Sequence, residues 1–381
     1  MFRKIAVLGA GNGGYAMAAD LSMAGYYVNL YEDPDCIENI EAVNKRGGIE
    51  VVARSYTGEE IILPAGGKTG FAKLKGKATT NIKEALDGVD LIMLIVPGFV
   101  REKFIRKMAS LIKDGQTIVI WPAYFGALQC SNLLGKMGIK KNIIICETES
   151  ILYVSRKSGP AKVSIMGTKN KLLLSAFPSK NTSKIIKDLQ EIYPQIVEAK
   201  NVFETTFSNV NPPLHPQCVL LNLYRVERKF YPYYEILDGP FCSAYDVTPG
   251  MAKVMEKIDM EKAELAKRYS LNILSLQETL NKFYGACGDS LYEVISNCYA
   301  YKNQVAPASI TSRYVTEDLL FAFVPFVYLA NQNSEELPVI RGMVEIGKAA
   351  TGIDFWNDGL KLEDLGLHGK SINEINKYLL G

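Results

Sequence analysis

Short apolar runs alternate with amphipathic segments through the first 147 residues of the chain. Residues 3–8 predict a short buried strand, a helical pattern follows the next glycines to about Ala24, and residues 26–32 predict a second strand. The alternation continues with predicted helices at 81–88, 100–113 and 125–137 and predicted strands at 89–98, 116–122 and 142–147. Strands that alternate with helices predict a parallel sheet with helices on both faces.

Two other segments carry the strand pattern without intervening helices. Residues 49–63 alternate around a Thr-Gly turn and predict a β-hairpin inserted after the second strand. After Glu147, residues 151–157 and 161–167 predict an antiparallel hairpin around Ser-Gly-Pro. A helix near 180–191 and a strand near 195–200 would complete this domain.

Helical periodicity dominates from about residue 217 to the end, with a long amphipathic helix predicted at 254–269. The proline-rich stretch at 209–216 marks the boundary. The sequence therefore predicts an α/β fold, with a Rossmann-type parallel-sheet domain at residues 1–208 and a mostly α-helical domain at 209–381. A chain of 381 residues is long enough for two such domains.

Charge and composition exclude several classes of protein. The net charge is only +2, and no cluster of basic and aromatic residues predicts a nucleic-acid surface. The longest apolar run, at 319–330, contains a proline and is too short to span a membrane, so it predicts a buried helix. Seven cysteines without a CxxC pair and only two histidines argue against a metal site, and we expect reduced thiols in a cytoplasmic protein.

The first strand ends in a glycine-rich turn with the spacing G-x-G-x-x-G. Gly9 would form the tight turn, Gly11 would let the backbone approach a pyrophosphate, and Gly14 would let the helix pack closely on the strand. Asn12 lies at the start of the helix, whose N–H groups would bind the phosphates. The turn predicts a dinucleotide-binding site, since it falls between a strand and a helix.

The second predicted strand ends in an acidic residue, Glu32, 18 residues after Gly14. A carboxylate there would accept hydrogen bonds from the ribose hydroxyls of NAD and repel the 2′-phosphate of NADP. Asp33 would add to this repulsion, and the basic residues Lys45 and Arg46 come only later. The sequence therefore predicts NAD as the cofactor in preference to NADP.

Other strands end at the same edge of the predicted sheet. Val96 and Pro97 would contact the ribose and nicotinamide side of the cofactor. Trp121 could serve there or as a core aromatic residue. The remaining residues that end strands at this edge are Pro122, Glu147 and Thr148.

Reduction of a carbonyl or an imine also needs a proton donor. His368 lies in a glycine-flanked loop and is expected on the surface. His215 lies at the domain boundary, just before a predicted helix, where a two-domain dehydrogenase closes on its substrate. Composition alone leaves the role of His215 open.

Two motifs, together with GAGNGG at 9–14, point to a family. With NPPLHPQ at 211–217 and SRYVTEDLLFAFVP at 312–325, the whole chain resembles the opine dehydrogenases, which include octopine and nopaline dehydrogenases. The resemblance implies an N-terminal Rossmann domain and a helical C-terminal domain. It also implies an NAD(P)H-dependent reductive condensation of a 2-oxo acid, commonly pyruvate, with the amino group of an amino acid.

The resemblance implies roles for individual residues. The catalytic histidine of the family falls on His215, its partner aspartate on Asp318 and its carboxylate-binding arginine on Arg313. An arginine fork suits a planar carboxylate, and an aspartate beside a histidine fixes its tautomer. Glu317 could bind the ammonium group of the amino donor or cap the local backbone. For Thr148, at its strand end, we expect contact with substrate.

The chain departs from the family pattern in two places. Gly98 and Arg101 follow the VP strand end where a small residue and a histidine are expected, and Arg101 could bind a phosphate, bind a carboxylate or face solvent. The segment 121–127 is bulky, so that Tyr124 and Phe125 could narrow the substrate site. Both departures bear on the identity of the substrate.

Two other functions remain open. A 2-oxo acid reductase of ketopantoate-reductase type has the same architecture but commonly uses a lysine at the start of the helical domain, and residues 205–225 contain none. A dinucleotide-sensing protein without turnover would lack the catalytic residues, whereas His215, Arg313 and Asp318 are all present. The amino donor and the oligomeric state cannot be read from the sequence, because an apolar helical face can form a domain core or a homodimer interface.

Overall fold

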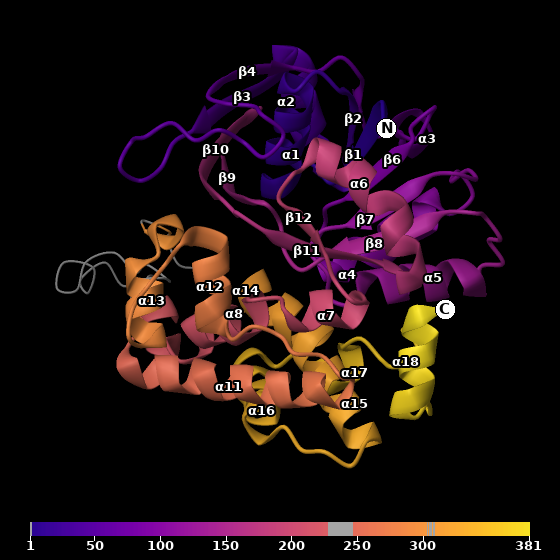
Figure 1. Cartoon of the computed structure of the whole chain (residues 1–381). Helices are drawn as coiled ribbons and strands as arrows, with labels where there is room; N and C mark the ends of the chain where they lie inside the picture. The colour runs from indigo at the N-terminus through magenta and orange to yellow at the C-terminus, as the bar shows by residue number, and fades with distance from the viewer. Residues whose placement is uncertain (1, 228–246, 303, 305–306, 308) are drawn as a thin grey trace. The chain divides into compact units, whose positions relative to one another are not determined.

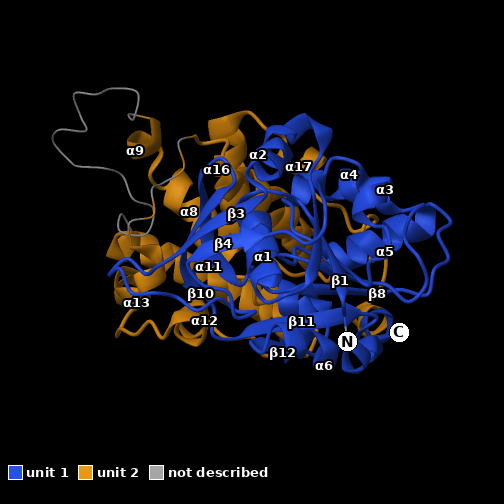
Figure 2. Ribbon diagram, turned by 90° about the horizontal axis from the view of Figure 1, so that it is seen from above, with its two compact units in different colours: residues 1–206, 377–381 blue, residues 207–376 orange. Residues whose placement is uncertain are grey.

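A computed structural model of the chain describes residues 2–227, 247–302, 304, 307 and 309–381. The chain forms two compact units, residues 1–206 with 377–381 and residues 207–376 (Figure 2). Among the described residues, no helix has the length and apolarity needed to cross a membrane.

The first unit is built on an eight-stranded sheet whose central strands are parallel and buried. Within this sheet, only the pairing of β11 with β8 is antiparallel. In spatial order the strands are β12 (Ile196–Glu198), β11 (Leu172–Phe177), β8 (Ile144–Thr148), β7 (Thr117–Ile120), β6 (Leu91–Leu94), β1 (Lys4–Leu8), β2 (Tyr27–Tyr31) and β5 (Ala78–Thr79). The helices of this unit are α1 (Asn12–Met23), α2 (Glu38–Arg46), α3 (Ile82–Ala85), α4 (Gly98–Met108), α5 (Gly126–Lys136), α6 (Thr182–Ile192) and α7 (Val202–Phe207), which ends at the division.

The strands and helices predicted at 3–32 and 81–147 are confirmed, whereas α2, β5, β11 and the strand at 70–73 were not predicted from the sequence. The strand β11 has five apolar residues and one serine, begins shortly after the 161–167 strand and turns back to pair with β8. The hairpin predicted at 151–167 is confirmed as β9 (Tyr153–Gly159) and β10 (Lys162–Thr168).

The hairpin predicted at 49–63 is wrong in its pairing. The strand β3 (Gly48–Ala53) pairs with β4 (Gly70–Lys73) and, in parallel, with β10, which makes a four-stranded sheet. The Thr-Gly turn contributes only a single bridge between Arg54 and Glu60. The loop between β3 and β4 bonds to α1, where the Asp20 carboxylate accepts hydrogen bonds from Ala65 N and Gly67 N, each at 2.8 Å. It also returns to the end of β3, where Ile61 N donates to the carbonyl oxygen of Ala53 at 2.9 Å.

Helix α1 packs between the two sheets of the first unit (Figure 1). It contacts β1 and β2 of the large sheet and all four strands of the small one. Its side chains are buried from Gly14 to Ser22. The helix that follows the glycine turn is thus fixed on both sides, and its two ends are less buried than its middle.

The second unit is helical, as predicted, and its central helix α8 (Asn211–Leu220) contacts α11, α14, α16 and η5. Pro212 and Pro213 stand in its first turn, where the missing N–H groups cost little. The other described segments are α9 (Leu223–Glu227), α11 (Pro249–Arg268), α12 (Leu276–Tyr284), α13 (Leu291–Asn297), α14 (Arg313–Asp318), η5 (Leu319–Phe323), α15 (Val324–Gln332), α16 (Pro338–Thr351), α17 (Phe355–Asp358) and α18 (Ile372–Leu380), whose last residues belong to the first unit.

The apolar run at 319–330 is a buried helix, as predicted, but it opens as the π-helical turn η5. Pro325 follows this turn and has no backbone N–H, so it cannot donate the hydrogen bond that a continuous α-helix would require there. Single π-turns inside helices are frequent at functional sites, and this one begins directly after Asp318.

Candidate active site

The glycine turn after β1 is sterically fixed. Gly9 has a φ of +106°, and a Cβ there would lie 2.5 Å from the carbonyl oxygen of Ile95 and 2.7 Å from Cγ1 of Val96. A Cβ on Gly14 would lie 1.7 Å from the carbonyl oxygen of Gly9. Both positions therefore require glycine, and the turn lies against the end of β6, where Val96 and Pro97 lead into α4.

The N-terminus of α1 fits the pyrophosphate of a dinucleotide. Gly11 is exposed, and a Cβ there would have no heavy atom within 4 Å. No side chain caps this end of the helix. The side-chain oxygen of Asn12 accepts a hydrogen bond from Lys157 N at 2.8 Å, and its carbonyl accepts one from Ser155 Oγ at 3.2 Å, which ties the turn to β9. Backbone N–H groups of the first helical turn are thus left for an anion.

Glu32 follows β2 and is buried against the glycine turn. Its carboxylate accepts hydrogen bonds from Ala10 N at 2.7 Å and Asp33 N at 2.8 Å. Burial raises the pKa of Glu32 above its ordinary value of 4.5, although these two N–H groups act to lower it. The residue predicted to meet the ribose also stabilises the turn that would hold the phosphates.

Asp33 is paired with two lysines that the sequence analysis did not consider. Lys103 and Lys107 on α4 approach its two carboxylate oxygens at 3.0 and 2.6 Å. Burial alone would raise the pKa of Asp33, but the hydrogen bonds from Lys107 and Lys103 lower it to about 2. Cations thus do reach the end of β2, from a helix about 70 residues further along the chain.

The bulky segment after β7 is braced from inside the first unit. Arg101 is only 1% exposed, and its Nη1 donates to the carbonyl oxygens of Ala123 and Tyr124, both at 3.1 Å. Tyr124 and Phe125 have φ values of +55° and +56°, a strained region for residues with a side chain. The suggestion that Arg101 faces solvent is wrong, because its side chain holds this turn.

Glu147 is fully buried at the end of β8 and links three segments. Its carboxylate accepts hydrogen bonds from Ala127 N at 2.8 Å, Thr205 Oγ1 at 2.7 Å and Thr206 Oγ1 at 2.9 Å. Thr206 Oγ1 in turn accepts from Phe125 N at 3.0 Å. The sequence placed Glu147 at the sheet edge but did not predict that it braces α5 and α7. An acidic residue at the end of an apolar strand was the signal that could have indicated this role.

The remaining candidates in the first unit are buried. Trp121 has no exposed surface and packs edge-on against Tyr193, so it is a core aromatic residue. Tyr124 is almost fully buried, and the Thr148 hydroxyl donates to the carbonyl oxygen of Ser150 at 2.8 Å. Contact of Tyr124 and Thr148 with substrate stays a prediction.

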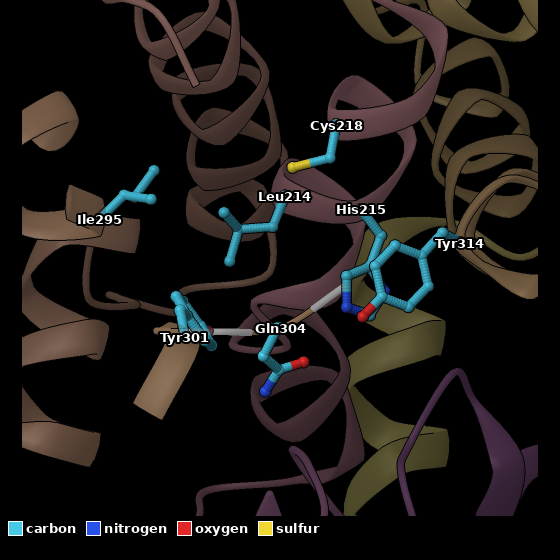
Figure 3. Close-up of a pocket in the computed structure, with 7 residues that line it drawn as sticks. All are labelled: Leu214, His215, Cys218, Ile295, Tyr301, Gln304 and Tyr314. Carbon is cyan, nitrogen blue, oxygen red and sulfur yellow. The ribbon is translucent and has the colours of Figure 1, made fainter. Parts of the chain in front are cut away.

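The second unit brings His215 and Asp318 together. His215 Nδ1 lies 3.0 Å from Asp318 Oδ2, with the aspartate side chain fully buried and the histidine side chain 22% exposed. The imidazole stacks on the ring of Tyr314, at a centroid distance of 3.9 Å and an interplanar angle of 10° (Figure 3). Tyr314 was missed, although its position four residues before Asp318 places both on one face of α14.

His215 lines a pocket within the second unit (Figure 3). The other residues that line it are Leu214, Cys218, Ile295, Tyr301, Gln304 and Tyr314. Arg313 is exposed at the start of α14, and Glu317 is buried near its end. His368, the other histidine, is exposed and pairs with Glu363 at 2.9 Å, in line with its predicted surface position. Among the described residues, no group of acids, cysteines and histidines could hold a metal ion.

Comparison with known proteins shows which family these features belong to. A family model described as "NAD/NADP octopine/nopaline dehydrogenase, alpha-helical domain" matches residues 198–351. An opine dehydrogenase from Arthrobacter sp. (strain 1C) is 30% identical over 368 residues, which cover 96% of each chain. The chain belongs to the opine dehydrogenase family. The predicted resemblance and fold class are therefore confirmed, and the chain is an oxidoreductase that uses a nicotinamide dinucleotide.

Solved structures of the opine dehydrogenase family share this fold. An octopine dehydrogenase in complex with NADH and agmatine matches with a TM-score of 0.74 at 19% identity and covers 98% of this chain and 97% of its own. A yersinopine dehydrogenase with NADP⁺ bound matches with a TM-score of 0.70 at 13% identity and covers 99% and 98%. One relative thus holds NADH and the other NADP⁺, so the fold alone leaves the choice of dinucleotide open.

Proposed function

We propose that the chain catalyses the NADH-dependent reductive condensation of a 2-oxo acid with the amino group of an amino acid. The observation that carries this proposal is the pair formed by His215 and Asp318 at a pocket in the helical unit. Membership of the opine dehydrogenase family supports it. A cytoplasmic location stays a prediction.

The pair suits proton transfer. With Asp318 accepting from Nδ1–H, the neutral imidazole carries its lone pair on Nε2, which is then the nitrogen that exchanges protons. The buried carboxylate also stabilises the imidazolium once it forms. Stacking on Tyr314 fixes the plane of the ring, so that one orientation is available to the substrate.

The reaction needs two proton transfers at one place. The amine nitrogen bonds to the carbonyl carbon of the 2-oxo acid, and its proton passes through His215 to the carbonyl oxygen, which becomes a hydroxyl. A second proton, taken up from solvent and donated by His215, lets this hydroxyl leave as water and gives a protonated imine. When bound, NADH would supply the hydride for the imine carbon, and the product is then the secondary amine. General acid–base catalysis of this kind contributes about 100- to 10,000-fold in rate.

The substrate carboxylate needs a cation, and Arg313 is the proposed partner. It is exposed at the first position of α14, five residues before Asp318. A guanidinium can bind a carboxylate through two parallel hydrogen bonds. We propose that Glu317 either binds the ammonium group of the amino donor or supports the backbone around α14, and its burial is compatible with both.

The proposed cofactor is NAD in preference to NADP. Glu32 and Asp33 place two carboxylates at the end of β2, beside the glycine turn. Glu32 would accept hydrogen bonds from ribose hydroxyls, and both carboxylates would oppose a 2′-phosphate. Michaelis constants for NADH and NADPH test this preference, and tighter use of NADPH would reverse it.

The function is tested by following NADH oxidation with pyruvate and a mixture of amino acids. The proposal requires that oxidation depends on both substrates. Oxidation that ignores the amine would instead identify a 2-oxo acid reductase, and NADH binding without oxidation would indicate a sensor.

The His215→Ala variant tests the proton donor. Turnover should fall by about 100-fold or more, as expected when general acid–base catalysis is lost, while NADH binding stays nearly intact. His368→Ala is the matched control, since this exposed histidine pairs with the surface residue Glu363. Unchanged turnover in His215→Ala would remove the residue from the mechanism.

A further inference from the structure

Four charged side chains form a cluster at the end of β2, which we call the Asp33 cluster: Asp33, Asp35, Lys103 and Lys107. Asp33 Oδ1 lies 3.0 Å from Lys103 Nζ, and Asp33 Oδ2 lies 2.6 Å from Lys107 Nζ. Asp35 approaches only Lys103 within the cluster, at 2.6 Å. Asp33 is therefore the one member that contacts both ammonium groups.

The two acids differ in burial. The side chain of Asp33 is 9% exposed, whereas that of Asp35 is 77% exposed. An ion pair with an exposed partner is weak because solvent screens it, and a buried partner holds its cations more firmly. The lysine side chains keep 44% and 34% of their surface exposed, so a ligand can reach them.

The cluster lies where the adenosine ribose of a bound dinucleotide is expected. Asp33 N donates to Glu32, and the same carboxylate accepts from Ala10 in the glycine turn. In a Rossmann fold the acid at the end of the second strand marks the ribose 2′-position. The 2′-phosphate of NADP would thus approach Asp33 and the two lysines.

The charges of the cluster sum to zero while both acids are present, and Asp33 supplies the buried carboxylate that contacts both lysines. Two carboxylates and two ammonium groups sum to zero, and loss of Asp33 leaves a net charge of +1 beside two lysines on successive turns of α4. A phosphate monoester carries about −1.5 to −2 charges near neutral pH and three strong acceptor oxygens. The same two ammonium groups could therefore bind a phosphate in place of a carboxylate.

We propose that Asp33 determines cofactor specificity by occupying Lys103 and Lys107, which would otherwise bind a 2′-phosphate. This inference rests on the proposed use of NAD. It assigns the rejection of NADP to an internal carboxylate that fills a cationic site, in addition to direct repulsion by Glu32. The chain therefore contains a binding site for a ribose 2′-phosphate that one side chain keeps closed.

Cofactor binding to Asp33→Asn tests this inference. Dissociation constants for NADH and NADPH are measured by nicotinamide fluorescence, which needs no turnover. The ratio of NADPH to NADH affinity should rise at least tenfold over the unmodified chain, and the gain should shrink as salt is raised, because exposed charges are screened. Asp35→Asn is the matched control, and its ratio should stay within threefold because Asp33 still holds both lysines.

A second pair of variants identifies the cations. Adding Lys107→Met or Lys103→Met to Asp33→Asn should remove most of the gain, while methionine keeps much of the side-chain volume. A ratio for Asp33→Asn within twofold of the unmodified chain, at equal melting temperature, would overturn the inference. So would a gain that survives both lysine substitutions.

The binding assay separates this inference from the proposed function. If the condensation fails but NADPH affinity rises in Asp33→Asn, the reaction is wrong and the specificity site stands. If the unmodified chain binds NADPH as tightly as NADH, the cofactor preference and the role of Asp33 both fail, whatever the outcome of the condensation assay.

Discussion

Removal of the Glu147 carboxylate should lower the free energy of unfolding of the first unit, because this buried group accepts hydrogen bonds from two helices. The carboxylate accepts three hydrogen bonds of 2.7–2.9 Å from α5 and α7. In Glu147→Ala, Ala127 N–H would be left buried without an acceptor, at a cost of about 1–3 kcal/mol. The hydroxyl of Thr205 loses less hydrogen-bond energy, since it also reaches the carbonyl oxygen of Val202 at 2.9 Å.

The remaining cost comes from packing and charge. The substitution removes one buried methylene, worth about 0.8 kcal/mol, together with the carboxyl group, and leaves part of their volume as a cavity. Arg101, whose positive charge acts against the effect of burial on the pKa of Glu147, would lose a nearby opposite charge. We therefore expect a total loss of about 3–5 kcal/mol, the range for breaking a buried pair. Glu147→Gln keeps the shape and one acceptor oxygen, so its loss should be about 1–2 kcal/mol.

Urea unfolding of the whole chain measures these losses through a probe in the first unit. Trp121 is fully buried there, beside Tyr193, and its fluorescence should report the transition in a Trp356→Phe background, because Trp356 lies in the second unit. Thr205→Val is the matched partner variant, and the double variant with Glu147→Gln should lose less than the sum of the single losses because the two side chains share one hydrogen bond. A loss below about 1 kcal/mol in Glu147→Ala would refute the bracing role, since it would match an ordinary surface substitution.

The pH dependence gives a second check on Glu147. Burial raises its pKa above the ordinary value of 4.5. The folded state then binds the proton more tightly than the unfolded state, so this carboxyl favours folding most at pH values below 4.5, and the contribution falls as pH rises through the higher folded pKa. The deficit of Glu147→Gln should therefore be larger at pH 5 than at pH 8. A deficit that grows with pH would contradict this assignment.

Three further substitutions address the catalytic and cofactor residues. Asp318→Asn keeps the shape but no longer selects the Nδ1–H tautomer of His215, so kcat should fall about 100-fold or more while the Kd for NADH is unchanged; equal kcat would exclude the pair from catalysis. Arg313→Lys should chiefly raise KM for the 2-oxo acid, since an ammonium cannot form the paired hydrogen bonds, and an unaffected KM would break that assignment. Gly14→Ala places a Cβ 1.7 Å from the Gly9 carbonyl oxygen and should abolish NADH fluorescence enhancement, whereas Gly135→Ala, with open space around its Cβ, should bind NADH normally.

The local pattern of the chain was sufficient for most of the fold. Apolar runs, helical periodicity and the glycine turn depend on neighbours in sequence, and the strands and helices at 3–32 and 81–147 follow them. The pairing of β3 with β10 joins segments more than 100 residues apart and left no periodic signal. The hairpin error has the same cause, because the bonds of this loop to Asp20 join residues 45 and 47 positions apart.

The candidate site also combines residues that the sequence predicted with residues that it could not predict. The pairing of His215 with Asp318 was anticipated only through two family motifs, since nothing local relates residues 103 positions apart. Tyr314 follows from helical spacing once Asp318 is placed. Lys103 and Lys107 could not be related to Asp33 from spacing alone, because the packing of α4 beside β2 is a property of the folded sheet.

Both ends of the predicted cofactor site depend on α4. Arg101 in its first turn holds the segment after β7, and Lys103 and Lys107 hold Asp33 at the end of β2. The helix itself begins directly after Val96 and Pro97. Because one rigid element carries these contacts, a substitution that shifts α4 should change dinucleotide specificity and the turn at Tyr124 together. Substitutions of Arg101 and Asp33 should then be non-additive, which a double-mutant cycle on the ratio of NADPH to NADH affinity would measure.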